Sequence, residues 1–304
     1  MKERPNGKVL IALDPTEPDL RPTPSSLVWI KNWVRDCEAS VEAVYVSPPH
    51  VGAQITDFAF SDYVNTLNLG KQVNAKILYE KSTSRRAAVD ALVQYAIETE
   101  ADLIVVSSHG RSGPGRVVLG SFAESLMATS PVPLLFLAEG SDSQLPTHSK
   151  ILFPTDLSET SKRTLDLFLE QISGFSGELI LYHSILPPGP LWDAGIFGVP
   201  YALPEDYWTE LSQWVLKECD LMLKKIVEKG MKVRLIVEDG PFGAASGIEK
   251  IAQKENVDLI VMPSVSHGIE SAIIGSVGKA VIRFKKWPVW AYGPEAVSKK
   301  EEQK

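Results

Sequence analysis

Apolar residues recur along this chain in short continuous runs, separated by longer stretches in which they return at every third or fourth position. The runs of the first half predict strands at residues 8–14, 41–47, 73–79, 102–107 and 132–138. A run that is apolar at consecutive positions, as from Leu103 to Val106, is typical of a parallel strand covered on both faces. Strands that alternate with helical stretches predict an α/β fold in which helices connect parallel strands.

Helix signals lie between these runs. Ser84 precedes an apolar stripe of helical spacing and is a suitable N-cap, and Ser158 takes the same place in the second half. Residues 205–229 have the pattern of a long amphipathic helix.

The first half of the pattern returns in the second half. Residues 8–14 (KVLIALD) return as 150–156 (KILFPTD), 101–106 (ADLIVV) as 257–262 (VDLIVM), and 119–121 (LGS) as 274–276 (IGS). Such self-similarity predicts repeated structural units. We therefore expect two tandem domains at residues 1–149 and 150–304, each an open five-stranded, mostly parallel sheet with helices on both faces.

Two stretches fall outside the repeat. Residues 139–149 are polar and contain Gly, Ser and Pro, as in a linker. The second copy is longer from Pro187 to about Tyr207, where Pro, Gly and aromatic residues predict a long loop. Its aromatic residues either pack over their own domain, which is the commoner outcome, or form a surface for a partner.

Composition narrows the classes of function. The chain has 304 residues, 44% hydrophobic and 23% charged, which is typical of folded globular domains. A net charge of -7 disfavours binding to a nucleic-acid backbone. No apolar run approaches the roughly 20 residues that span a bilayer. Cys37 and Cys219 have no metal-ligand neighbours, so neither a disulfide framework nor a zinc site is predicted and a cytoplasmic protein is expected.

Candidate chemistry follows the strand at 102–107. In open parallel sheets a ligand lies beyond the C-terminal ends of the strands. Here the chain carries three closely spaced glycines, Gly110, Gly113 and Gly115, and then Gly120-Ser121 at the start of a predicted helix. Glycines let the backbone approach a phosphate, while N–H groups of a first helical turn and a Ser hydroxyl donate to its oxygens. The segment therefore predicts an anion-binding loop.

This arrangement resembles the universal stress protein family, in whose ATP-binding members the loop has the pattern G-x2-G-x9-G-[ST]. Gly110 matches the second glycine, and nine residues later Gly120-Ser121 match the end of the motif. Ser107 stands in place of the first glycine, where its side chain would either crowd a nucleotide or add a hydrogen bond. The resemblance covers residues 7–138 and 150–293.

The resemblance implies that the first domain binds ATP or another adenine nucleotide, either with or without Mg²⁺. The implied contacts come from Asp14 near the adenosine, Val46 at the adenine, Val106 and Ser107 at the ribose, and Gly110, Gly120, Ser121 and the Phe122 amide at the phosphates. From the residues alone, a role of Asp14 in a turn or helix cap is about as well supported as contact with the adenosine. The structural role and the adenosine contact are compatible.

The second copy departs further from the motif. Pro263 and Ser266 replace its two glycines, the loop is one residue shorter, and Pro263 has no N–H to donate. A degenerate site is predicted here, formed by Asp156, Ser184, Met262, Ser266, Gly275, Ser276 and Val277. The second domain would then serve pairing or regulation.

The family also implies that the last strands of two domains pair. Residues 132–138 and 288–292 could do so within one chain, giving an intramolecular pseudo-dimer, and a homodimer of chains and a protein partner are left open. We expect a stress-response protein that binds a nucleotide and at most hydrolyses it weakly, without catalytic residues or a metal site.

The alternative is a scaffold without nucleotide binding that contacts a protein or small ligand through the 187–207 loop. An ATP-using transferase or ATP pyrophosphatase of related topology ranks last, because no nucleophile, pair of metal ligands or acceptor-substrate site is recognisable.

Overall fold

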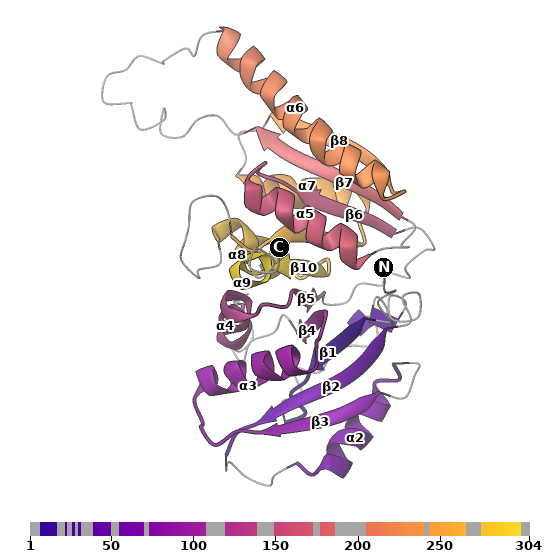
Figure 1. Ribbon diagram of the computed structural model, residues 1–304, viewed down its shortest axis with the longest axis vertical. Coiled ribbons are helices and arrows are strands. Elements are labelled where there is room, and N and C mark those ends of the chain that lie inside the picture. The colour runs from indigo at the N-terminus through magenta and orange to yellow at the C-terminus, as the bar shows by residue number, and fades with distance from the viewer. Residues whose placement is uncertain are drawn as a thin grey trace, which may run out of the picture.

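The computed structural model describes residues 7–16, 22, 26–27, 30–31, 39–49, 55–69, 73–107, 119–138, 149–172, 177–185, 205–239, 243–265 and 275–298. Figure 1 shows two α/β halves along the long axis of the molecule, the N-terminal half below and the C-terminal half above.

All strands join one ten-stranded sheet in the order β3-β2-β1-β4-β5-β10-β9-β6-β7-β8. The first half contributes β1 (Lys8–Ala12), β2 (Ser40–Ser47), β3 (Asn74–Tyr79), β4 (Leu103–Ser107) and β5 (Leu134–Leu137). The second half contributes β6 (Ser149–Pro154), β7 (Gly177–Ile185), β8 (Lys232–Asp239), β9 (Leu259–Pro263) and β10 (Val289–Tyr292). Each half thus has five parallel strands in the same relative order, which confirms the predicted fold class.

The two halves meet through the antiparallel pair of β5 and β10, whose register places Val289 opposite Phe136 and Trp290 opposite Leu135. The last strands of the two copies therefore pair within the chain, as expected for a pseudo-dimer. The pairing removes two sheet edges that would otherwise expose unpaired backbone groups.

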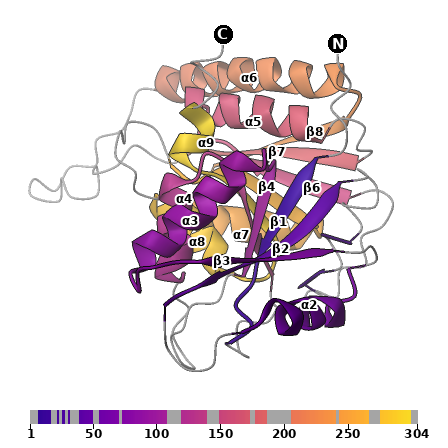
Figure 2. The same ribbon diagram turned by 60° about the horizontal axis from the view of Figure 1, so that its bottom comes forward.

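Helices cover both faces of this sheet (Figures 1 and 2). They are α2 (Asp57–Thr66), α3 (Arg85–Glu98), α4 (Ser121–Thr129), α5 (Glu159–Gln171), α6 (Glu205–Glu228), α7 (Ala244–Glu255), α8 (Ser276–Arg283) and α9 (Pro294–Ser298). One apolar cluster joins buried residues of α2, α5, α6 and α9, and another joins those of α3, α4, α7 and α8. Each cluster runs through both halves.

Two predicted helix starts are confirmed in atomic detail. The Ser84 hydroxyl accepts a hydrogen bond from the Ala87 amide at 3.1 Å, and the Ser158 hydroxyl accepts one from the Ser161 amide at 3.2 Å. Each bond satisfies one of the first-turn N–H groups that have no partner inside a helix.

Side chains from both halves hold the seam together. Gly293, directly after β10, lies against the last turn of α4, where an added Cβ would overlap the carbonyl oxygen of Met127. The Gln171 side-chain amide donates to the Asp102 carbonyl across the seam at 3.0 Å, and Gln171 Oε1 accepts from the Tyr292 hydroxyl. The two halves are therefore joined by more than one strand pair.

The predicted linker and long loop mostly lie outside the described residues, although α6 begins within the expected amphipathic stretch. Among the helices that the structure describes, none combines the length and apolar character needed to cross a membrane.

Candidate functional site

The predicted site residues of the first domain that the structure describes lie at one edge of the sheet. Asp14 follows β1, Val46 lies near the end of β2, and Val106 and Ser107 end β4. Because β1 pairs in parallel with both β2 and β4, the C-terminal ends of the three strands meet there. The predicted phosphate contact Gly110 lies outside the described residues, as does Ser266 of the second copy.

The end of β2 extends past β1. Ala12, the last residue of β1, pairs with Val44, whereas Val46 pairs with Leu78 of β3 on the other side. After Ala12, the Leu13 amide continues the contact between β1 and β2 by donating to the Val44 carbonyl at 2.9 Å. Val46 thus lies beyond the paired end of β1, at the edge of the sheet where α/β folds bind ligands.

Asp14 shapes the turn that follows β1. Its Oδ1 accepts hydrogen bonds from the Thr16 amide at 3.0 Å and from the Thr16 hydroxyl at 2.5 Å. The turn interpretation of this aspartate is confirmed, and contact with an adenosine remains a prediction.

The N-terminus of α4 faces the same edge. Gly120 is its N-cap with extended backbone angles (φ -59°, ψ 138°), and no side-chain hydrogen bond caps this end among the described residues. The amides of Ser121 and Phe122 lie in the first turn, where N–H groups have no partner within the helix and attract anions.

Glu124 also lies in this first turn, where its carboxylate would oppose a bound anion. It forms an ion pair at 3.5 Å with Lys279, which belongs to α8 of the second domain. The two residues are equivalent positions of the repeat, because each lies four residues after the Gly of a Gly-Ser pair. The second domain therefore offsets an acidic charge beside the candidate site of the first.

The corresponding edge of the second domain is built differently. Pro263 takes the place of Ser107 as the last residue of its strand, so this position offers no N–H. The Gly275 amide, at the N-cap of α8, already donates to the Ser264 carbonyl at 2.8 Å. Met262 is buried. In the second domain, therefore, position 263 has no N–H and the Gly275 amide already has an acceptor. The equivalent of Ser264 in the first domain is Ser108, which lies outside the described residues.

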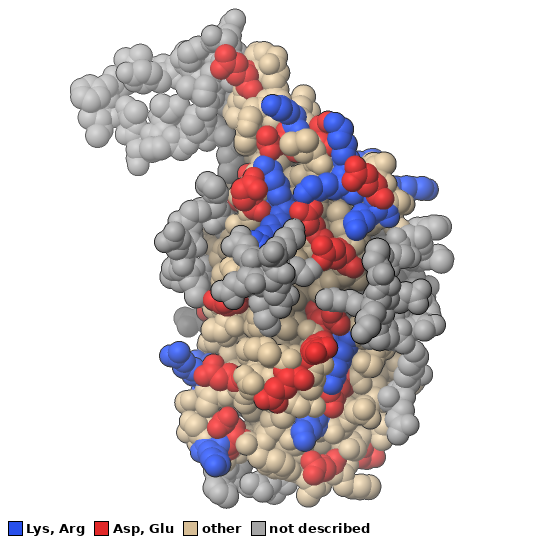
Figure 3. All heavy atoms as spheres, in the orientation of Figure 1, with Lys and Arg blue, Asp and Glu red and all other residues tan. Residues whose placement is uncertain are grey.

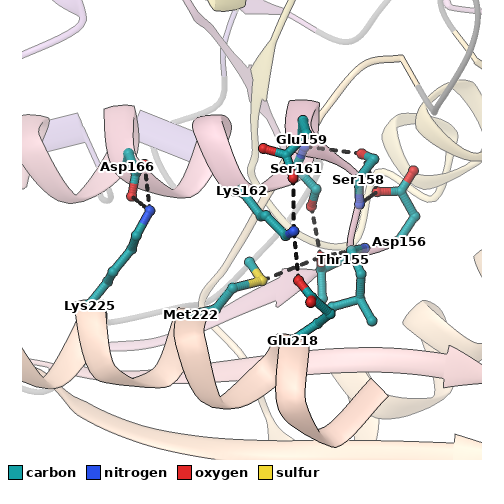
Figure 4. Close-up of polar contacts among 11 residues, drawn as sticks. Thr155, Asp156, Ser158, Glu159, Ser161, Lys162, Asp166, Glu218, Met222 and Lys225 are labelled. Carbon is teal, nitrogen blue, oxygen red and sulfur yellow. Dashed lines mark hydrogen bonds and ion pairs between the residues drawn. The ribbon is translucent and has the colours of Figure 1, made fainter. Parts of the chain in front are cut away.

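Asp156 repeats the turn of Asp14. Its Oδ1 accepts from the Ser158 amide at 3.1 Å and from the Ser158 hydroxyl at 2.6 Å (Figure 4). Ser184 lies near the end of β7, and Ser276 and Val277 open α8, so these predicted residues also lie at the C-terminal edge of their half-sheet.

A polar network beneath this turn was not predicted from the sequence. The Thr155 hydroxyl accepts from the Leu157 amide at 3.0 Å and bonds the Ser161 hydroxyl at 2.8 Å, as Figure 4 shows for Thr155 and Ser161. Nδ1 of His183 lies 2.8 Å from the Thr155 carbonyl oxygen. The only signal for the network was a threonine where the first copy has Leu13.

Groups for metal or nucleophilic chemistry are scarce in the part of the chain that the structure describes. It contains no cluster of three His, Cys, Asp or Glu residues that could hold a metal ion. Cys219 is fully buried in α6, and burial raises the pKa of its thiol to about 11. The thiol is therefore protonated at neutral pH and is a poor nucleophile.

Comparison with known proteins gives a consistent picture over the whole chain. The model of the universal stress protein family matches residues 6–137 and again residues 147–293. The universal stress protein MJ0577 of Methanocaldococcus jannaschii is 29% identical over an alignment of 159 positions that covers 47% of this chain and 93% of that protein.

Two solved structures share the architecture of both halves. The functionally unknown protein PA1789 from Pseudomonas aeruginosa has a TM-score of 0.65 at 14% identity, covering 98% of this chain and 97% of its own. A universal stress protein from Archaeoglobus fulgidus has a TM-score of 0.61 at 16% identity, covering 94% and 98%. At these identities the likeness shows the fold alone.

Proposed function

The chain belongs to the universal stress protein family, with two domains of that family in tandem, and from this premise we propose that its first domain binds an adenine nucleotide, ATP foremost. The observation that carries the proposal is the first-domain edge itself. It brings the ends of β1, β2 and β4 to the N-terminus of α4, where Gly120 and Ser121 close the nucleotide motif. Ligand contact at each of these positions is part of the proposal.

In the proposed complex the phosphates lie at the first turn of α4. The amides of Ser121 and Phe122 and the Ser121 hydroxyl donate to phosphate oxygens, and the helix dipole favours their charge. The adenosine lies across the ends of β1 and β2 near Asp14 and Val46, with the ribose at Val106 and Ser107. Mg²⁺ would enter as part of the nucleotide complex.

We further propose that the second domain does not bind a nucleotide and serves pairing and regulation. Its support is Pro263, which has no N–H at the position of Ser107, and the ion pair through which Lys279 reaches Glu124. We also propose a cytoplasmic location, where a reducing environment keeps thiols such as that of the buried Cys219 free.

The test is isothermal titration of the full chain with ATP, ADP and AMP, together with mass spectrometry of nucleotide that co-purifies. The expected result is one binding site per chain and little phosphate release from ATP. Lack of binding at millimolar nucleotide, with none co-purifying, contradicts the proposal. Two equivalent sites per chain contradict the assignment to the first domain alone.

The scaffold alternative depends on the 187–207 loop, of which residues 187–204 lie outside the described part of the chain. It remains a prediction from the sequence.

A further inference from the structure

The sheet ends in the second domain at β8, an eight-residue strand that pairs only with β7 among the described strands. Its outer side therefore presents backbone donors and acceptors without a ladder partner in that part of the chain. Edge strands of this kind are templates for pairing with another chain unless they are shortened, bent or covered.

The helix that covers β8 shows which of its flanks faces outward. Acidic and basic side chains gather together over α5 and α6 (Figure 3). Glu218 and Lys225 of α6 pair with α5, through Lys162 at 2.7 Å and Asp166 at 2.8 Å (Figure 4). Trp214, which lies four residues before Glu218, continues the same stripe. This stripe is the inner flank of α6, directed toward the middle of the sheet.

The opposite flank of α6 borders the outer edge of the sheet. It carries Leu216, Leu223 and Val227, spaced by seven and four residues and therefore on one side of the helix. Leu216 is 53% exposed and Val227 is 59% exposed, whereas Leu223 packs against the core. This outer flank, defined by these three residues, is an apolar strip beside the sheet edge.

The side chains of β8 extend that strip onto the strand. Val233, Leu235 and Val237 alternate along β8, face α6 and are only partly buried against the core. Because β8 follows α6 after a short turn, the strand runs back along the helix and places these residues beside the outer flank. Strand and helix together form one continuous apolar edge.

The other face of β8 carries its charges. Arg234 is held by Glu178 at 2.5 Å and Glu255 at 2.7 Å. Lys232 is exposed and has no ion pair with the residues that the structure describes, while Glu238 has a long contact of 3.5 Å with the exposed Lys250. A free basic residue thus lies at one end of the strand and an acidic residue at the other.

We propose that this edge binds a second copy of the chain, with the two β8 strands antiparallel about a two-fold axis perpendicular to the sheet. Because the axis is perpendicular to the sheet, side chains that lie opposite each other are on the same face. Odd-numbered residues therefore lie opposite odd-numbered residues, and even-numbered opposite even-numbered. Centring the axis on Leu235 places Lys232 opposite Glu238 of the other copy, twice by symmetry, and Val233 opposite Val237. The register centred on Arg234 would instead oppose two like charges.

The opposite end of the sheet lacks this self-complementarity. The edge strand of the first domain, β3, has the sequence NAKILY, in which Lys76 is charged and no acidic residue is present. Antiparallel pairing of two β3 strands would give Lys76 no opposite charge. An isologous contact through β8 also closes at two copies rather than growing into a fibre.

A charge swap tests the pairing directly. We would measure the dimer dissociation constant of the full chain by sedimentation equilibrium for the wild type, Lys232→Glu, Glu238→Lys and the double variant. The wild type is expected to dimerise, and either single change should raise the dissociation constant roughly tenfold or more, because each creates two like-charge contacts. The double variant should return to within about threefold of the wild type.

Restoration in the double variant would report contact between copies, because Lys232 and Glu238 lie near opposite ends of the same strand and cannot compensate each other within one chain. Lys76→Glu on β3 is the matched control and should leave dimerisation unchanged. Thermal melting of each variant checks that the fold is intact.

The apolar edge is tested on α6. Leu216→Asp on the outer flank should weaken the dimer, whereas Leu221→Asp, at a site 49% exposed but on the inner stripe seven residues after Trp214, should not. A wild-type chain that stays monomeric to millimolar concentration overturns the proposal. So does a dimer that is insensitive to the single charge changes, or one that the double swap fails to restore.

Discussion

The aspartates that follow the first strand of each domain, Asp14 and Asp156, make almost the same turn, but the two domains differ in the sequence of the glycine motif. Asp14 binds the amide and hydroxyl of Thr16 at 3.0 and 2.5 Å, and Asp156 binds those of Ser158 at 3.1 and 2.6 Å. A turn kept in both halves, although only one half retains the glycine motif, is explained by structure alone. The aspartate is therefore a poor marker of nucleotide binding, and the loop with its helix start must decide.

The halves also differ beneath that turn. Leu13 and Thr155 are equivalent, because their amides donate to Val44 and Tyr182 at the same register of the second strand. Leu13 is an apolar core residue, whereas Thr155 centres a network with Ser161 and the backbone of Leu157. Where the first domain has apolar packing, the second therefore has buried hydrogen bonds below the turn.

The largest predicted effect separates the two helix starts. Gly120→Asp should reduce ATP affinity about a hundredfold, because a carboxylate beside the phosphates costs several kcal/mol. Gly275→Asp, the equivalent change in the second domain, should leave affinity unchanged. Titration calorimetry with each variant measures the contrast.

Both changes should leave the fold intact. Gly120 and Gly275 are N-caps with negative φ angles of -59° and -63°, and Asp is a favoured residue at that position. Unchanged or raised melting temperatures are the control. Equal loss of affinity in the two variants would remove the distinction between the domains.

A second prediction concerns the seam that both halves share. Gly293→Ala should lower the free energy of unfolding by about 1–3 kcal/mol, since its Cβ overlaps the Met127 carbonyl and the backbone of α4 must shift. Gly243→Ala is the control, because nothing lies within 4 Å of an added Cβ there and only a weaker N-cap effect is expected. Urea unfolding measures both, and equal losses would show that the seam is loosely packed.

The sequence predicts most of this architecture because strand runs, helix caps and the repeat are local patterns. The end of β1 differs: the expected strand at 8–14 stops at Ala12, since Asp14 draws the chain into a turn with Thr16. β5 begins at Leu134, after Pro133, which has no N–H to extend a ladder. Strand boundaries thus depend on side-chain hydrogen bonds and on missing N–H groups, neither of which apolar periodicity shows.

The candidate site was predicted less completely than the fold. The residues at the strand ends and helix starts could be found from motif spacing. The contact between Glu124 and Lys279, and that between Thr155 and Ser161, join residues whose proximity depends on how helices and domains pack. No spacing rule brings them together in the sequence.

The third prediction tests the exchange beneath the turn. Thr155→Val keeps the shape of the side chain but leaves the Leu157 amide without its acceptor, which should cost about 1–2 kcal/mol of unfolding free energy. Ser161→Ala should cost less, because the Thr155 oxygen still accepts from that amide. Urea unfolding of the two variants measures both losses of unfolding free energy. A larger loss in Ser161→Ala would show that the network depends on Ser161 more than on Thr155.

The smallest predicted effect asks whether the second domain influences the site of the first. Lys279→Glu places a second acidic group beside Glu124 at the start of α4, and should weaken ATP binding by about two- to fivefold at low salt, with less effect as salt screens the charges. Combining it with Glu124→Lys should restore the affinity, measured by titration at two ionic strengths. Lys286→Glu is the control, since Lys286 pairs with Glu249 inside the second domain. If that control weakens binding equally, the effect is one of net charge and the two halves are electrostatically independent.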